Sequence, residues 1–383
     1  MTHLAYVCQD RGIPFEGAKG SSIHFRSMVR AFAQSDVDVD VISPRVPVNG
    51  VPELPSVSFH FLGSAANSAD GVATLLDEIH RGAPIDAVYE RLSLHADGAS
   101  RWCGTAGVPH VLEVNAPLTD EAARFRKVDD PDGTRKIERA VIQGADLVLP
   151  VSPWIRRWLI EQGVDTNRAR VLPNGVGEDW LRSQPLSNKE IDPGDKPLKV
   201  VFVGSLRPWH DLDTLLDAFE LLPEDFFRLE IVGDGPGAMH IRQRLEDARL
   251  AEKVALCGAV PHDEVMRLID SSDACVAPYS DSSDFYFCPI KVFEYGARRR
   301  PVVAADVPAL REQFPEGSLV YYRRGGVPHL AETLERLRLD RGLQSRTAGR
   351  LHDFVSGHTW EAHARSVLEW AGLRSGEPIG EVQ

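Results

Sequence analysis

The sequence predicts an α/β protein with two doubly wound domains, each built on a parallel sheet. The chain has 383 residues, which is long for a single hydrophobic core. Short runs rich in β-branched residues alternate with segments of helical spacing along nearly the whole chain. A polar stretch with three prolines, residues 183–197, interrupts the alternation near the middle. Strands that alternate with helices indicate a parallel sheet covered on both faces.

The first predicted domain spans residues 1–182. Its helices are indicated by apolar residues at helical spacing, such as Phe25, Met28, Val29 and Phe32. Six strands are expected, at Leu4–Cys8, Val37–Ser43, Val57–Leu62, Ile85–Glu90, His110–Val114 and Leu147–Val151.

The second predicted domain spans residues 198–358 and follows the linker 183–197. A last helix, at about residues 359–373, is expected to pack back on the first domain. Six further strands are expected, at Lys199–Val203, Arg228–Val232, Val254–Leu256, Ala274–Ala277, Val302–Ala304 and Leu319–Tyr321.

Composition excludes several classes of function. The formal net charge of −13 argues against nonspecific binding of nucleic acid, which needs a basic face. No apolar run approaches the length of a bilayer span, and the start of the chain indicates a first strand rather than a signal peptide. The five cysteines are scattered without metal-ligand spacing, which fits a cytoplasmic protein without a bound metal.

Ligands of doubly wound sheets bind beyond the carboxyl ends of the strands, so two such domains face to face predict a site in the cleft between them. Gly17 and Gly20 form a glycine loop after the first strand, at the start of a helix that also carries His24. Glycines let a backbone approach a ligand closely, and a helix start favours anions. The alternative is an ordinary loop between a strand and a helix. The cluster from Gly233 to Gly237 lacks the spacing of a dinucleotide site.

The most informative stretch is Asp284–Ala297. Pro289 suits the first turn of a helix, and Lys291 and Glu294 lie three residues apart on it. A carboxylate can accept both hydroxyls of a ribose, and a lysine can neutralise a phosphate. The alternative is a surface ion pair. The arginines that end the segment, Arg298–Arg300, are expected to form a solvated helix end.

The segment Cys288–Ala297 resembles the retaining glycosyltransferases of family 4, in the branch with a motif close to SPxKxxEYxA. Further stretches agree with this family, in the same order along nearly the whole chain: Tyr89–Arg91, Leu112–Pro117, Leu172–Val176, Phe202–Leu206, Val232–Pro236 and Val302–Asp306. The resemblance implies the GT-B fold, in which two Rossmann-like domains face each other across a cleft.

The resemblance also implies roles for individual residues. Glu294 would bind the ribose of a nucleotide sugar, and Lys291 would neutralise its diphosphate with Arg207 or a protonated His210. Arg91 and Glu113 would join the catalytic group, and Asn115 and His24 would face the acceptor side. The donor-binding residues are expected to be Gly17, Gly20, Gly204, Ser205, Gly233, Tyr286, Phe287, Cys288 and Glu294.

Several positions depart from the family pattern. The first glutamate of its best-known motif falls on Tyr286, so Asp281, Asp284, loop N–H groups or nothing would take its place. The usual arginine and lysine at the diphosphate are replaced by Ser205 and His210. Donor identity therefore stays open.

The expected function is transfer of a sugar from a nucleotide diphosphate donor to a soluble small-molecule or glycan acceptor, without a cofactor or a metal. A sugar-nucleotide epimerase on the same fold is one alternative. A nucleotide-sugar-binding protein without catalysis is another, because fold does not fix function. Neither nucleic acid nor an integral membrane segment is expected as a partner, and a homodimer stays open.

Overall fold

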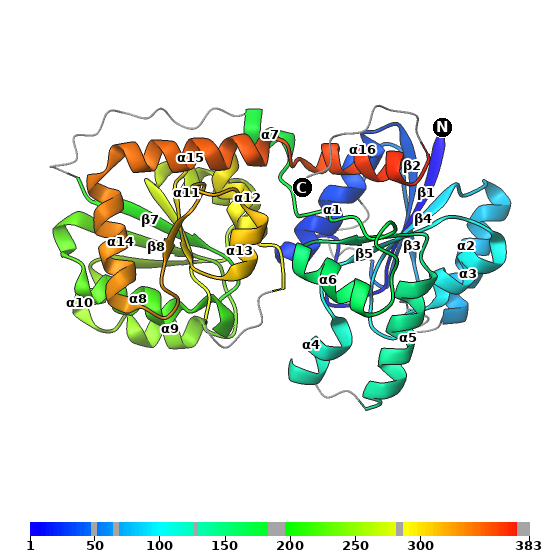
Figure 1. Cartoon of the computed structure of the whole chain (residues 1–383), viewed down its shortest axis with the longest axis horizontal. Helices are drawn as coiled ribbons and strands as arrows, with labels where there is room; N and C mark the ends of the chain where they lie inside the picture. The colour runs from blue at the N-terminus through cyan, green and yellow to red at the C-terminus, as the bar shows by residue number, and fades with distance from the viewer. Residues whose placement is uncertain (47–51, 64–68, 126–128, 183–195, 281–285, 374–383) are drawn as a thin grey trace. The chain divides into compact units, whose positions relative to one another are not determined.

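The computed structural model describes residues 1–46, 52–63, 69–125, 129–182, 196–280 and 286–373 (Figure 1). The chain divides into two compact units. Unit 1 contains residues 1–174, residues 286–288 and the segment from Trp360 onward, and unit 2 contains residues 175–285 and 289–359. Most of the predicted linker, up to residue 195, lies outside the described residues, as do Asp281 and Asp284.

Unit 1 is built on a six-stranded sheet in which every paired strand is parallel. The strand order is β3-β2-β1-β4-β5-β6. Its strands are β1 Thr2–Cys8, β2 Val37–Ser43, β3 Val57–Phe61, β4 Ala87–Arg91, β5 His110–Val114 and β6 Leu147–Pro150. Each overlaps the range predicted from its run of β-branched and apolar residues.

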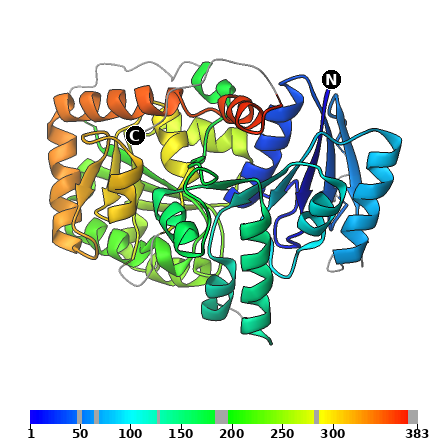
Figure 2. The same ribbon diagram turned by 45° about the vertical axis from the view of Figure 1, so that its right-hand side comes forward.

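Alternation along β1 divides the unit 1 core between the two faces of the sheet. Ala5 and Val7 pack with α2 and α3, whereas Tyr6 points the other way, with its ring centroid 5.1 Å from that of Phe25 on α1. The two views show α1 and the pair α2 and α3 on opposite faces (Figures 1 and 2). Residues of β1 are therefore buried on both sides, as a central parallel strand requires.

Helices surround this sheet. The C-terminal helix α16, which carries Trp360, lies beside α1 (Figure 1). The helices of unit 1 are α1 Gly20–Ala33, α2 Ala69–Gly82, α3 Gly98–Ala106, α4 Leu118–Phe125, α5 Pro131–Gly144, α6 Pro153–Glu161 and α16 Trp360–Trp370.

Unit 2 repeats the same strand order on a second parallel sheet, β12-β11-β10-β7-β8-β9. Its strands are β7 Leu198–Val203, β8 Phe227–Val232, β9 Val254–Gly258, β10 Ala274–Ala277, β11 Val302–Ala305 and β12 Val320–Tyr322. Its helices are α7 Glu178–Arg182, α8 Leu212–Leu221, α9 Ala238–Arg244, α10 Ala248–Ala251, α11 His262–Ser271, α12 Ile290–Ala297, α13 Pro308–Gln313, α14 Val327–Leu339 and α15 Arg341–Ser356.

The order of both sheets confirms the predicted fold class, two doubly wound α/β units. In each sheet the first strand lies in the middle. The next strands are added towards one edge, and the order then reverses and continues towards the other edge. The reversal lies between β1 and β4 in unit 1 and between β7 and β10 in unit 2. Ligands of such sheets bind beyond the carboxyl ends of the strands at this reversal. The segments that follow these four strands are therefore where a site is expected within each unit.

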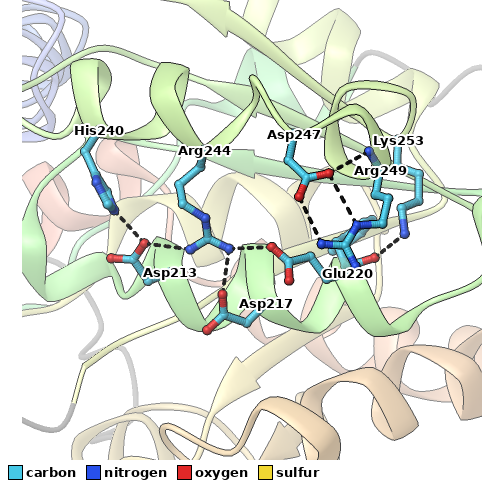
Figure 3. A network of polar contacts seen from close by, with 9 residues as sticks. Asp213, Asp217, Glu220, His240, Arg244, Asp247, Arg249 and Lys253 are labelled. Carbon is cyan, nitrogen blue, oxygen red and sulfur yellow. Dashed lines mark hydrogen bonds and ion pairs between the residues drawn. The ribbon is translucent and has the colours of Figure 1, made fainter.

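On the surface of unit 2, one arginine joins helices α8 and α9 (Figure 3). The Arg244 guanidinium lies 3.2 Å from Asp213, 2.7 Å from Asp217 and 2.8 Å from Glu220. The three acidic residues are four and three positions apart, so they share one face of α8. His240, one turn before Arg244, also contacts Asp213 at 2.7 Å. Because these groups are partly exposed, water weakens each ion pair. The network stabilises the contact between α8 and α9 because several weak pairs act together.

The arginines after α12 correct the sequence-based expectation of a solvated helix end. Arg298 is only 1% exposed, and its guanidinium makes two hydrogen bonds to Asp270, of 2.7 and 2.6 Å, and one to the Trp180 carbonyl. Arg300 is also buried and donates to the Asp270 carbonyl. Arg299 alone of the three is exposed. The expectation was wrong because Asp270, 28 residues earlier, is brought to the helix end by tertiary packing.

Replacing Arg298 by Met should lower the free energy of unfolding by about 3–5 kcal/mol, because Asp270 would stay buried without its counter-charge. Urea denaturation followed by circular dichroism measures the loss. The matched control is Arg299→Met, which removes an exposed charge from the next position and should stay within about 0.5 kcal/mol of the wild type. Equal losses in the two variants would contradict the assignment of a buried ion pair.

Candidate functional site

Two glycines bring the loops after β7 and β8 of unit 2 into close contact. Gly204 has φ +153° and Gly233 has φ +135°. A Cβ atom on Gly233 would lie 1.9 Å from the Gly204 carbonyl oxygen, so no other residue fits there. Sequence reasoning placed Gly233 among the donor-binding residues, whereas the structure places it behind Gly204. A Cβ on Gly204 itself would lie 2.8 Å from Lys291 Nζ.

Lys291 lies in the first turn of α12, and its ammonium group points to the loop after β7. The side chain is 9% exposed. Its Nζ atom makes no hydrogen bond to any residue that the structure describes. It lies 4.2 Å from the centroid of the Phe202 ring and 5.8 Å from that of Tyr279, residues at the ends of β7 and shortly after β10. Lys291 therefore occupies the reversal point of the unit 2 sheet.

Two opposing effects act on the charge of Lys291. Burial favours the neutral amine, whereas the Phe202 ring and the Glu294 carboxylate favour the cation. Burial is the larger effect, and it lowers the pKa of Lys291 from 10.5 to about 7. A buried ammonium without a hydrogen-bond acceptor is an unfavourable arrangement in the ligand-free protein. An anion placed beside Nζ would remove both costs.

His210 does not supply the second positive charge that the sequence suggested. Its ring is 7% exposed, and its Nδ1 atom lies 2.5 Å from the Ser205 carbonyl oxygen. Burial, with the charge of Lys291 added, lowers the pKa of His210 to about 2. The imidazole is therefore neutral near pH 7. Arg207 is partly exposed and lies over the Trp209 ring, 5.6 Å from its centroid. Arg207 is therefore the positively charged side chain of this loop, near Lys291 of α12.

Glu294 lies one turn after Lys291 and is 5% exposed. The structure does not contain the Lys291–Glu294 surface ion pair that was the alternative interpretation. Glu294 Oε1 instead accepts a hydrogen bond of 2.7 Å from His262 Nε2, at the start of α11. The Trp180 ring lies against His262, with centroids 4.9 Å apart. His262 thus holds the carboxylate in one orientation.

In unit 1, a buried carboxylate organises the segment after β5. Glu113 is 1% exposed and has donors on both oxygens. Arg91 and Asn115 donate to Oε1, and Tyr89 donates to Oε2 over 2.7 Å. His24 Nε2 lies 2.9 Å from Oε2. Burial alone would raise the pKa of Glu113, but His24 and Arg91 outweigh it and hold that pKa well below its usual range.

The structure thus brings together the four unit 1 residues predicted to be catalytic or acceptor-side. Arg91 and Glu113 are buried and bonded to each other, whereas Asn115 is only partly buried. His24 is 3% exposed, and its second ring nitrogen, Nδ1, lies 2.7 Å from Asn174 Oδ1. Both ring nitrogens of His24 thus have hydrogen-bond partners within unit 1.

The glycine loop of unit 1 precedes α1, which begins at Gly20. A Cβ on Gly17 would lie 2.3 Å from the hydroxyl oxygen of Ser22, a residue with no exposed surface. That hydroxyl has no hydrogen-bond partner among the described residues. Arg26 steadies the loop by donating to the Phe15 carbonyl over 2.8 Å and to the Gly17 carbonyl over 3.2 Å.

Residues 286–288 precede α12 in sequence but belong to unit 1. The Tyr286 hydroxyl donates to Glu121, and the Tyr286 carbonyl accepts from the Ser152 hydroxyl over 2.6 Å. Phe287 is partly buried, with its ring centroid 5.9 Å from that of Tyr286. Cys288 is buried, which raises the pKa of its thiol to about 12. The side chains of these residues thus pack in unit 1.

Sequence reasoning missed several residues that touch the predicted ones. Asn174 stood within a stretch that resembles the family, but no signal linked it to His24, 150 residues earlier. His262 and Glu121 carry no local signal. Phe202 and Tyr279 could have been found, since both lie at the carboxyl ends of neighbouring central strands.

Membrane-spanning helices and metal-binding clusters are both absent from the described part of the chain. No helix there is both long and apolar enough to cross a bilayer. No group of three or more histidine, cysteine or acidic side chains there could hold a metal ion.

Two family models match the chain. Residues 18–180 match the model for Glycosyltransferase Family 4, and residues 197–340 match the model for Glycosyl transferases group 1. The chain belongs to glycosyltransferase family 4. The resemblance seen in the sequence is thereby confirmed, and the two matches meet near the predicted linker.

Curated relatives of this family 4 chain carry glycosyltransferase names. The chain is 29% identical to a D-inositol 3-phosphate glycosyltransferase of Frankia alni, over 70% of this chain and 69% of that protein. It is 28% identical to the putative colanic acid glycosyltransferase WcaL of Escherichia coli, over 46% of this chain and 44% of that protein. The matched part therefore spans less than half the length of WcaL.

Solved structures establish the GT-B fold of the family 4 chain. Sucrose-phosphate synthase from Thermosynechococcus elongatus matches with a TM-score of 0.77 and 16% identity, over 97% of this chain and 99% of that one. Anabaena HepE, solved with UDP-glucose, matches with a TM-score of 0.72 and 16% identity, over 98% and 100%.

Replacing Lys291 by Met should stabilise the ligand-free protein. The folded pKa of about 7 lies below the unfolded 10.5, so folding has to bury a charge at low pH. This cost is fully present below pH 7 and is lost as the pH rises from 7 to 10.5. The free energy of unfolding should therefore rise on the order of a few kcal/mol at pH 6 and hardly change at pH 10.

Urea denaturation at pH 6, 8 and 10 measures the effect of Lys291→Met. Lys199→Met serves as the control, because Lys199 is exposed on β7 and should show no comparable gain. A loss of stability in Lys291→Met at every pH would show that the lysine supports the fold rather than awaiting an anion.

Proposed function

We propose that the chain is a retaining glycosyltransferase that moves a sugar from a nucleoside diphosphate donor to a hydroxyl of a small-molecule or glycan acceptor. One observation carries this proposal. The ammonium of Lys291 is buried without a hydrogen-bond partner among the described residues, at the reversal point of the unit 2 sheet. A family 4 chain with an unmatched buried cation at this place is suited to bind a diphosphate.

The names of related proteins support a nucleotide-sugar donor. HepE was solved with UDP-glucose, and a relative from Mycobacterium tuberculosis, 28% identical over 48% of this chain, is named as GDP-mannose-dependent. These two donors share a diphosphate joined to a ribose and to a sugar. Lys291 suits the diphosphate. Glu294, oriented by His262, suits the ribose, because its Oε2 makes no hydrogen bond to the described residues.

The proposed step breaks the bond between the sugar C1 and the diphosphate oxygen and forms a bond from C1 to the acceptor oxygen. The departing diphosphate gains negative charge, and stabilising that charge is the main catalytic task. Lys291 meets this charge in a site screened from water, where an ion pair is stronger than at the surface. The acceptor proton passes to the departing phosphate, so no protein nucleophile is required.

Lys291→Met should lower kcat for sugar transfer roughly ten- to a hundred-fold, because Lys291 meets charge that grows as the sugar leaves. Glu294→Gln should instead raise the donor KM with little change in kcat, because the ribose changes little during the reaction. A glutamine still accepts the hydrogen bond from His262, so this variant removes the carboxylate charge and keeps the contact. Initial rates with a panel of UDP-, GDP- and ADP-sugars and candidate acceptors measure both effects.

The exposed Lys199 again supplies the control, since Lys199→Met should leave both kinetic constants unchanged. If both site variants left the donor kinetics unchanged, Lys291 and Glu294 would not belong to the donor site. Turnover of the donor to an epimer without any acceptor would replace glycosyl transfer by epimerisation. Tight donor binding without turnover on any acceptor would indicate a binding protein.

Transfer should also proceed equally well in excess EDTA, since we propose that Lys291, Arg207 and backbone N–H groups neutralise the diphosphate. Rates measured with EDTA, and with added Mg²⁺ or Mn²⁺, check this. A rate that collapses with EDTA and returns with either metal would show that the site needs a cation that the chain does not supply.

A further inference from the structure

The chain passes between the two units at four places, and at three of them the unit 1 residue lies next to His24 or to its partner Asn174. The chain leaves unit 1 after Asn174 and again after Cys288, and it returns at Trp360. His24 Nδ1 lies 2.7 Å from Asn174 Oδ1, and the centroids of the His24 and Trp360 rings are 4.8 Å apart. Asn174 in turn donates from Nδ2 to the Cys288 carbonyl. Asn174, Cys288 and Trp360, the unit 1 residues at these three places, are thus linked through His24 and Asn174.

The hydrogen bonds of Asn174 fix which of its amide atoms faces His24. Because Nδ2 of Asn174 donates to the Cys288 carbonyl, Oδ1 must be the atom that faces His24, and it can only accept. The other ring nitrogen of His24 faces Glu113, whose carboxylate is also an acceptor. Both nitrogens of His24 therefore face hydrogen-bond acceptors within unit 1.

Residues 286–288 are held by several further groups of unit 1. The backbone N–H of Asn174 donates to Cys288 Sγ over 3.3 Å. The Ser152 hydroxyl and Glu121 bind the carbonyl and the hydroxyl of Tyr286. The next residue, Pro289, is the N-cap of α12, so the segment held in unit 1 leads directly into the helix that carries Lys291.

We propose that His24 and Asn174 are positioning residues, which fix the carbonyl of Cys288 and, through the peptide bond to Pro289, order the first turn of α12, where Lys291 lies. Neither residue contacts the donor in this proposal. His24 orients Asn174, and Asn174 holds the backbone. The catalytic consequence rests on the proposed function, but the effect on α12 does not.

Asn174→Asp separates this role from simple packing. An aspartate has the same shape and still accepts a hydrogen bond from His24. Its second oxygen, however, faces the Cys288 carbonyl and repels it. The start of α12 should loosen, and amide hydrogen exchange in peptides covering Ile290–Ala297 should become roughly ten-fold faster. Transfer should lose kcat by a similar factor, with a smaller change in the donor KM.

Two further variants keep the result interpretable. Asn167→Asp adds the same charge at an exposed position of unit 1 and should change neither exchange nor turnover. His24→Gln breaks the pairing from the other side: if the Gln side chain donates to Glu113, its carbonyl faces Asn174, and an amide flip there turns an oxygen towards Cys288. His24→Gln should accelerate amide exchange in α12 in the same way. It therefore still tests the proposal if Asn174→Asp fails to fold.

The outcomes separate the two proposals. Faster exchange in α12 supports the positioning role even if the wild type transfers no sugar, a result that would overturn only the proposed function. An active wild type with normal exchange in α12 and normal kcat in both variants would overturn the positioning role. A uniform loss of stability across unit 1, without an effect centred on α12, would also overturn it, because it would make the pair purely structural.

Discussion

A charge removed from water needs a partner, and this constraint is met in opposite ways in the two units. In unit 1, Glu113 has partners on both oxygens: Arg91, His24, Tyr89 and Asn115. In unit 2, Lys291 faces aromatic rings and has no hydrogen-bond acceptor among the described residues. The first arrangement is complete and holds its surroundings rigid, whereas the second is incomplete and leaves a place for an anion. From this difference we propose a structural centre in unit 1 and a binding centre in unit 2.

Topology decides where these charges can lie. Both sheets have the same doubly wound order. Each therefore has one point where the connections after two neighbouring strands run towards opposite edges of the sheet. Loops at that point diverge. Beside it, Gly204 after β7 and Gly233 after β8 let their two loops meet backbone to backbone. Lys291 reaches this place because α12 follows β10, the strand beside β7. The fold thus supplies the position, and a few residues supply the chemistry.

The strands and the fold class could be predicted from the sequence because both depend on local pattern. β-branched runs such as Val37–Ser43 coincide with observed strands, since a parallel strand buried on both faces must be apolar. The α12 pair was found for a similar reason, because helical spacing places Lys291 and Glu294 on one side. What spacing cannot give is the partner across the fold. Asp270 binds the buried Arg298, and His262 binds Glu294. Asn174 likewise binds His24. Each of these hydrogen bonds joins residues far apart in sequence.

The departures from the family pattern make Lys291 more important in this chain. Ser205 and His210 stand where the family has two cations. Burial keeps His210 neutral, and the nearby charge of Lys291 adds to this effect. If both were charged, like charges would share a small buried space, and each would lower the pKa of the other. With His210 neutral, Lys291 meets less repulsion, and an arriving diphosphate can raise its pKa from about 7 and fix the proton. Anion binding should then be coupled to proton uptake, so the positive charge is present when the diphosphate is bound.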